Sequence, residues 1–309
     1  MLTVLSGGTG TPKLLQGLVE LVDENEITVI VNTGEDVEVS GLKVSPDLDA
    51  VIYTLAGLID ENKWYGVRND SYRGFEMLRA LGHDELLKMG DRDRAVKLYR
   101  TMRIERGDSL SAVTRDICSE LGVDSRVYPM TDDRVTTRIV VPEGELSFHE
   151  FWVERGGDVE IEDVEFIGSD EADPAPGVVD AIENSDIVLI GPSNPITSIG
   201  PIISIDEIRK ALKRNRQKNV AVSPIIGSSP VSGPTDVLMR GLDLDVNPSG
   251  VAKVYEEFVG TFFLHEDDDK YSESLVECNM KVLLEDIFLP DFSSRRRLAK
   301  SILEDLEYL

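Results

Sequence analysis

Hydrophobic positions near the start of the chain form two short, nearly continuous runs with a helical pattern between them. The runs lie at Leu2–Leu5 and Ile27–Val31, and Pro12–Leu21 carries apolar side chains at helical spacing. Strands that are apolar throughout are typical of a parallel sheet that helices cover on both faces. This pattern predicts an α/β fold with a Rossmann-like, mainly parallel sheet and helices on both of its faces.

The same alternation of strands and helices returns after residue 185. The predicted strands are Ile187–Ile190, Val220–Val222, Thr261–Leu264 and Leu275–Val276, and the predicted helices are Ile205–Lys213 and a tail from Ser293. On that tail we expect Arg295–Arg297 to face solvent, because a run of charge is usually a solvated helix face.

The middle of the chain departs from this alternation. Ser45 and Pro46 suit the N-cap and the first position of a helix, and further helical patterns cover Tyr72–Leu81, Arg92–Arg103 and Ser109–Leu121. From Arg126 to Gly168 the pattern favours strands, with a turn at Pro142–Glu145. We therefore expect one Rossmann-like domain over residues 1–309, in which residues 45–170 form a helical and β-rich insertion that serves as a substrate-binding subdomain.

The charge balance restricts the partners that the chain is expected to have. Its 32 basic and 58 acidic residues give a net charge of −26, which repels nucleic acid and anionic membranes. The two cysteines and three histidines are scattered singly, so no zinc site or disulfide framework is predicted. Without a signal segment or an apolar run of about 18 residues, we expect a cytoplasmic protein with no membrane partner.

A glycine-rich turn follows the first predicted strand. Gly7, Gly8, Thr9 and Gly10 stand where an open α/β sheet collects ligands and where a helix start offers N–H groups to an anion. Lys13 occupies the place at which the dinucleotide pattern needs its third glycine, and the ATP-loop pattern is absent. Phosphate binding is predicted, with a purely steric role for the glycines as the alternative.

Carboxylates gather after the second predicted strand. Asn32 and Asp36 follow that strand, and Asp47 and Asp49 fall in the first turn of the next helix. One aspartate there is explained by the helix dipole, but three beside the ligand edge favour a hard divalent ion. We therefore expect a metal site formed by Asn32, Asp36, Asp47 and Asp49.

Three other polar stretches are candidate ligand loops. Lys88 precedes Asp91 and Arg92 at the start of a predicted helix, where Asp91 also suits an N-cap. Loops rich in Gly, Ser, Asn and Pro follow two later strands, and turn chemistry is the alternative explanation for them. Their candidate nucleotide-binding residues are Ser193, Asn194, Pro195 and Ser223.

Together these motifs resemble the 2-phospho-L-lactate transferase or CofD family of deazaflavin coenzyme F-420 biosynthesis. The matching stretches extend to about residue 240 and include GGTGTPKLLQGL, SPDLDAVIYTLAGLID, KMGDRDRAVKLYRT, DIVLIGPSNPITSIGPII and SPIIGSSPVSGPTD. Gly-Glu-Asp at residues 34–36 replaces the Gly-Asp-Asp of many relatives, which removes no carboxylate. A branch of similar fold has regulatory or sugar-nucleotide roles, so likeness of fold alone does not settle function.

The resemblance implies a Rossmann-like core and a particular transfer reaction. A guanosine diphosphate-activated phospholactate passes its phospholactyl group to the ribityl hydroxyl of 7,8-didemethyl-8-hydroxy-5-deazariboflavin, GMP leaves, and the product is coenzyme F-420-0. It further implies Mg²⁺ and an archaeal, cytoplasmic homodimer. Sequence does not decide between phospholactate and phosphoenolpyruvate in the donor.

The resemblance also distributes roles among the residues. Asp49 and Lys88 are implied as deazaflavin contacts, together with Asp91 and Arg92 of the same motif. Asp49 is the best candidate for metal ligand or base, Asp36 and Asp47 support it, and Lys88 is a candidate to stabilise developing charge. The alternative function is a nucleotide- or sugar-nucleotide-binding regulator without turnover. A nicotinamide dehydrogenase is disfavoured by Lys13.

Overall fold

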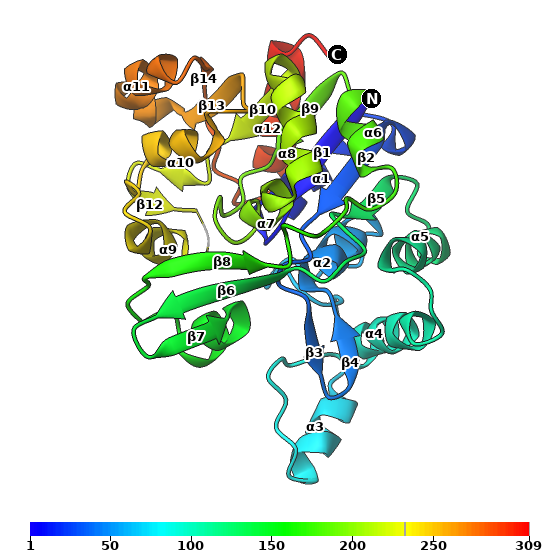
Figure 1. The fold of residues 1–309 in the computed structure, drawn as a ribbon. Coiled ribbons are helices and arrows are strands. Elements are labelled where there is room, and N and C mark those ends of the chain that lie inside the picture. Colours follow the sequence, from blue (N-terminus) through cyan, green and yellow to red (C-terminus); the bar gives the residue numbers. More distant parts are fainter. Residues whose placement is uncertain (232, 309) are drawn as a thin grey trace.

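The computed structural model describes residues 1–231 and 233–308, and a seven-stranded parallel sheet runs through their centre (Figure 1). The strand order is β14-β13-β10-β9-β1-β2-β5, and each strand is parallel to its neighbours. The strands are β1 (Leu2–Ser6), β2 (Ile27–Val31), β5 (Arg126–Pro129), β9 (Ile187–Ile190), β10 (Asn219–Val222), β13 (Thr261–His265) and β14 (Lys281–Glu285). The order reverses between β1 and β9, which is where such sheets bind ligands.

Helices cover both faces of this sheet because its strands are apolar on both faces. In β1, Val4 packs into one hydrophobic cluster and Leu5 into the other. The first cluster includes residues of α1 (Gly10–Leu18), α2 (Pro46–Leu55), α5 (Leu110–Glu120) and α12 (Phe292–Asp305). The second includes residues of α6 (Val178–Glu183), α7 (Gly200–Ser204), α8 (Asp206–Arg214), α9 (Thr235–Gly241), α10 (Pro248–Tyr255) and α11 (Ser272–Glu277). The predicted fold class is confirmed.

Smaller elements extend from the sheet toward one end of the molecule (Figure 1). A hairpin of β3 (Val37–Val39) and β4 (Leu42–Val44) lies near α3 (Arg73–Ala80) and α4 (Asp91–Ile104). A separate antiparallel sheet contains β6 (Thr136–Val141), β7 (Gly144–Ser147) and β8 (Asp163–Ile167). The remaining elements are the hairpin β11 (Ile225–Ile226) and β12 (Ser229–Pro230), the π-helix η2 (Glu150–Glu154), and the 3-10 turns η1 (Glu24–Glu26), η3 (Arg216–Lys218) and η4 (Glu266–Tyr271).

The structure differs from the sequence-based expectations at three places. Strand β5 lies inside the expected 45–170 insertion but pairs with β2 in the main sheet. The predicted strand Leu275–Val276 is wrong, because these residues belong to α11 and the edge strand β14 follows them. Arg295 is 4% exposed instead of facing solvent. No helix within the described ranges is long and apolar enough to cross a membrane.

Candidate active site

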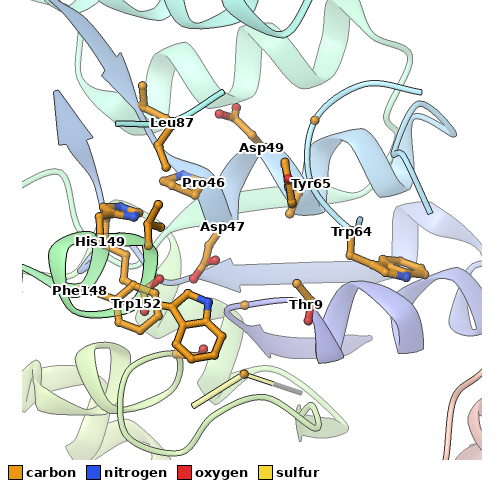
Figure 2. A pocket seen from close by; sticks show the side chains of 18 of the residues that line it. Thr9, Pro46, Asp47, Asp49, Trp64, Tyr65, Leu87, Phe148, His149 and Trp152 are labelled. Carbon is orange, nitrogen blue, oxygen red and sulfur yellow. The ribbon is translucent and has the colours of Figure 1, made fainter. Parts of the chain in front are cut away.

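A cavity of about 620 Å³ opens at the carboxyl ends of β1, β2 and β9. Seven parts of the chain line it: the turn after β1, the segment from Glu35 through α2, residues 57–90 between α2 and α4, the first turns of α4, the segment after β7, the loop after β9, and residues 233–234 before α9. We call residues 57–90 the α3 excursion. Figure 2 shows Asp47 and Thr9 between the aromatic side chains of two of these parts.

The glycine turn is packed tightly against the loop after β9. A Cβ on Gly7 would lie 2.6 Å from the Ser198 carbonyl oxygen, and one on Gly10 would overlap the carbonyl of Pro192. The Ser193 hydroxyl donates to the Gly7 carbonyl and accepts the Thr11 backbone N–H. The steric role of the glycines is therefore present, and residues 8–10 also line the cavity, as phosphate binding requires.

Asn194 brings a hydrogen-bond donor to the cavity from that loop. Its Oδ1 accepts the backbone N–H of Ile196 at 2.9 Å, which orients the side-chain amide. Its Nδ2 is buried and has no partner among the described residues. A buried donor without a partner is costly, so this group suits a ligand acceptor.

Asp47 is held at the cavity by neutral hydrogen-bond donors. Asn32 donates to its Oδ2 at 2.9 Å and also donates to the Thr197 carbonyl at 3.2 Å. Burial raises the pKa of Asp47 to about 6, against the opposing hydrogen bonds of Gly8 and Asn32. Two of the four predicted metal-site residues are thus brought together.

Glu35 and Asp36 are consecutive buried acidic residues beside Asp47. Burial is the main cause that raises the pKa of Glu35 well above its usual value, and the negative charge of Asp47 adds to this effect. Burial raises the pKa of Asp36 to about 8, although Ser45 donates to it at 2.7 Å. Glu35 lines the cavity described above, and both Glu35 and Asp36 line a neighbouring cavity of about 720 Å³. The sequence-based site had no role for Glu35.

Asp49 lines the cavity but is bound to two cations. Arg100 donates to both of its oxygens, at 2.5 and 3.2 Å, and Lys97 Nζ lies 2.9 Å from Oδ2. Burial alone would raise the pKa of Asp49, but Arg100 and Lys97 hold it below its usual value. Lys97 also binds Asp93. Sequence analysis missed Lys97 and Arg100, although their spacing from Asp93 puts all three near one face of α4.

Lys88 reaches the cavity from the α3 excursion. Its ammonium lies 4.4 Å from the centroid of the Tyr72 ring and 5.8 Å from that of Phe75. Lys88 and Phe75 both line the cavity, with Leu87 beside them. The prediction that Lys88 belongs to the site agrees with this position.

Aromatic side chains form the remaining walls. Phe148 and Trp152 lie on one side, from the segment after β7, and Trp64 and Tyr65 lie on another (Figure 2). Both tryptophans of the chain therefore line one cavity. Trp64 adopts a left-handed backbone conformation with φ of 62°, which is an outlier for a bulky residue. No spacing in the sequence identified these rings, because they meet only in the folded chain.

Several predicted site residues have other partners. Asp91 accepts the backbone N–H groups at the start of α3, and the side chain of Arg92 is exposed. Lys13 lies over the Trp64 ring at 5.4 Å, and burial lowers its pKa. The Ser223 hydroxyl donates to the Ile225 carbonyl at 2.7 Å. Pro195 is buried within its own loop.

The residues at the cavity suit a magnesium ion held mainly by its substrate. Across the described ranges, no group of three or more His, Cys, Asp or Glu side chains is arranged to hold a metal. Glu35 and Asp47 nevertheless both line the cavity, and Glu35 Oε1 is buried and has no hydrogen-bond partner among the described residues. Magnesium is usually held by one or two carboxylates together with phosphates and water, so this pair fits. The four-residue metal set stays a prediction.

Comparisons with known proteins agree on one family. The model of the family described as "2-phospho-L-lactate transferase CofD" matches residues 2–287. A 2-phospho-L-lactate transferase of Methanopyrus kandleri is 49% identical over 312 residues, covering 100% of this chain and 98% of that protein. The transferase of Methanocaldococcus jannaschii is 47% identical, covering 98% of this chain and 97% of that protein.

A solved structure supports the fold. A member of the upf0052 family from Bacillus halodurans has a TM-score of 0.65 and 16% identity, with 98% of both chains covered.

Proposed function

The chain belongs to the 2-phospho-L-lactate transferase CofD family, and on that premise we propose that it moves a 2-phospho-L-lactate group from lactyl-2-diphospho-5′-guanosine to 7,8-didemethyl-8-hydroxy-5-deazariboflavin. A ribityl hydroxyl oxygen forms a bond to the phosphorus that carries lactate. The bond from that phosphorus to GMP breaks, and the hydroxyl proton is lost. One observation carries the proposal: a single cavity contains two different surfaces. The glycine turn and the loop after β9 form a polar edge, and aromatic side chains line a slot, which we call the aromatic slot.

The polar edge suits the guanosine donor. A chain with a net charge of −26 must bind a diphosphate with few side-chain cations. Gly10 at the start of α1 and the amide of Asn194 offer neutral donors at the switch point of the sheet, and Gly8, whose N–H donates to Asp47, lines the same edge. Of the other predicted residues, Gly7 packs against Ser198 at this edge and Pro195 is buried in the loop after β9, whereas Lys13 lies over Trp64 and Ser223 binds Ile225.

The aromatic slot suits the deazaflavin acceptor. A planar tricyclic ring needs apolar and aromatic surfaces on its faces, and Phe75, Phe148 and Trp152 supply them. Lys88 at the edge of the slot offers a cation to the ring's polar atoms. Asp49, which Arg100 and Lys97 fix in place, remains the proposed contact for the ribityl hydroxyls.

Magnesium completes the proposed site. Glu35 and Asp47 would hold it, with Asn32 fixing Asp47, and with Asp36 and Asp49 as outer neighbours. When bound, the ion supplies positive charge to the diphosphate as the bond to GMP breaks. Phosphoryl-type transfer requires mainly positioning and charge neutralisation from the protein, and these residues are arranged for both.

The direct test is incubation of the protein with the guanosine-activated phospholactate, the deazaflavin and magnesium. We expect a product with the mass of coenzyme F-420-0 and one equivalent of GMP. Chelation by EDTA should stop the reaction, and magnesium should restore it. Binding of nucleotide without any coupled product would favour the regulator instead, and a phosphoenolpyruvate donor run in parallel identifies the three-carbon acid. Homodimer formation is a separate proposal, tested by light scattering.

A further inference from the structure

The α3 excursion supplies much of the cavity wall, and its residues 70–88 include no buried residue, whereas Ile59, Trp64 and Val67 at its start belong to the hydrophobic core. Helix α3 has no buried residue, and Figure 1 shows it projecting from the body of the molecule. Phe75 on this helix and Lys88 after it nevertheless line the cavity. Most surface helices are stabilised by packing an apolar face, so polar contacts must fix this one.

Two aspartates exchange hydrogen bonds with the beginnings of α3 and α4. The Asp70 carboxylate, which precedes α3, accepts the backbone N–H groups of residues 92 and 93 in α4, each at 3.0 Å. The Asp91 carboxylate, at the start of α4, accepts those of residues 73 and 74 in α3, at 3.1 and 2.9 Å. Each aspartate therefore satisfies orphan donors of the other helix. We call this arrangement the reciprocal cap.

Close backbone approach makes the reciprocal cap possible. Gly90 is the N-cap of α4, and a Cβ at this residue would overlap the Asp70 carboxylate. Ser71 donates its hydroxyl to Asp91 at 2.5 Å and accepts the Asp91 backbone N–H at 2.7 Å. The two helix starts are thus joined by side chains in both directions and by the backbone.

The reciprocal cap fixes the surroundings of Lys88. Tyr72, whose ring lies under the Lys88 ammonium, falls within the stretch 71–74 that Asp91 holds. Lys88 itself precedes Asp91 by three residues. The separation between this ammonium and the aromatic residues beside it is therefore set by the hydrogen bonds of Asp91 and Asp70.

We propose that Asp70 and Asp91 are positioning residues that hold Lys88 and Phe75 at the acceptor side of the cavity without touching substrate. The identity of the acceptor rests on the proposed function, whereas the reciprocal cap rests on the hydrogen bonds above. Asp91 thereby gains a role different from the deazaflavin contact that the family resemblance implies. If the reciprocal cap is lost, the acceptor must order the α3 excursion as it binds. The free energy spent on this ordering raises the KM for the acceptor.

Two substitutions at one residue separate positioning from contact. Asparagine is nearly as good a helix cap as aspartate and keeps an oxygen acceptor, but it carries no charge. We expect Asp91→Ala to raise the KM for the deazaflavin about tenfold and to change kcat by less than about twofold. Asp91→Asn keeps one acceptor oxygen but replaces the other with an NH2 group, so it should raise the KM for the deazaflavin by less than Asp91→Ala does. A fall in kcat without a rise in this KM, in either variant, would mean that the carboxylate contacts the reacting ligand, and would overturn the proposal.

Further variants test whether the two aspartates act together. Asp70→Ala should reproduce Asp91→Ala, and the double variant should have less than the product of the two effects, since either change loosens the same cap. Asp84→Ala is the matched control, because Asp84 is exposed on the same excursion. Multiplied effects in the double variant, or an equal rise in the KM for the guanosine donor, would contradict a shared positioning role.

Amide hydrogen exchange on the full chain without substrate tests the reciprocal cap apart from the reaction. Protection at residues 73–74 and 92–93 should fall in Asp70→Ala and Asp91→Ala and persist in Asp84→Ala. Unchanged protection would overturn the proposal whatever the activity. An unmodified protein that shows this protection but transfers no phospholactate would contradict the proposed function alone.

Discussion

Two walls of the same cavity are held in place by different forces. The glycine turn after β1 sits on the buried sheet, where Gly10 touches the Pro192 backbone and Ser193 binds Gly7. Residues 70–88 of the α3 excursion are held by the reciprocal cap and by a bidentate pair in which Arg94 donates to Glu85 at 3.0 and 2.5 Å. The first wall is therefore fixed by packing, whereas the part of the second wall that residues 70–88 form is fixed mainly by polar contacts.

This difference suits two kinds of ligand. A polyanion bound by backbone N–H groups gains most from donors whose positions are already fixed, because ordering them afterwards weakens binding. A planar ring gains from walls that can close on it. The wall formed by the glycine turn, which we call the packed wall, thus suits the guanosine donor. The wall formed by the α3 excursion, which we call the polar-held wall, suits the deazaflavin acceptor of the proposed reaction.

The largest expected effect comes from Gly10→Ala in the packed wall. The new Cβ would overlap the Pro192 carbonyl, a backbone atom that moves only if the loop after β9 moves. We expect a loss of about 3 kcal/mol in the free energy of unfolding, measured by urea denaturation, with weakened nucleotide binding. An alanine variant as stable as the unmodified protein would show that this wall is not rigid.

The next largest effect is expected at the link between the two walls. The Arg295 guanidinium donates to Gln16 at 2.7 Å and to Glu61 at 2.8 Å, and lies 4.6 Å from the Trp64 ring centroid. Arg295→Met should lower the free energy of unfolding by about 2 kcal/mol and shift Trp64 fluorescence. Arg296→Met, on the exposed neighbour, should cost about 0.5 kcal/mol or less. Equal effects of the two variants would argue against the link.

The buried carboxyl group of Asp36, after β2, gives a pH-dependent prediction. The raised pKa of Asp36 means that the folded state keeps a proton that the unfolded chain releases near pH 4. The stability of the fold therefore falls as pH rises from about 4 to about 8 and Asp36 is forced to ionise. Asp36→Asn should gain stability over the unmodified protein across this range, measured by urea unfolding. A difference that stays constant with pH would contradict the assignment.

The reciprocal cap should respond to pH in the opposite direction. Hydrogen bonds from Ser71 and Gly74 lower the pKa of Asp91, so its stabilising contribution is present above the usual pKa and is lost on acidification below it. Acidification therefore stabilises the fold through Asp36 and weakens the reciprocal cap at Asp91. The stability difference between Asp91→Ala and the unmodified protein should shrink below about pH 4.

The smallest effect is expected for a glycine of the excursion. Gly82 follows α3 with φ of 84°, and a Cβ there would meet no atom within 4 Å. Gly82→Ala should therefore cost only the backbone preference, about 1 kcal/mol in the free energy of unfolding. A loss as large as that of Gly10→Ala would remove the contrast between the walls.

The sequence predicted the elements of the packed wall because apolar periodicity reports burial within each strand or helix. The parallel sheet, the glycine turn and the helix at Pro46 follow from local signals of this kind. The strand predicted at Leu275–Val276 was wrong because two apolar residues cannot distinguish a strand from a buried helix turn.

The polar-held wall was harder to predict because its partners lie far apart in the sequence. Asp91 suited a cap of its own helix, but its carboxylate caps the other one. Arg295 suited a solvated face, yet its partners are Gln16 and Glu61. The pairing of Asp49 with Arg100 likewise joins residues 51 positions apart. Periodicity carries no information about such contacts.

The link through Arg295 also has a consequence for synthesis of the chain. Arg295 and Gln16 are 279 positions apart, and α12 packs against α1 beside the Trp64 ring. At the usual 5–20 residues per second, a ribosome needs roughly 15 to 60 s to make the stretch between them. During that time the nascent chain carries the glycine turn without the arginine that secures Trp64. The finished cavity therefore appears only late in translation, after nearly all the other elements have been made.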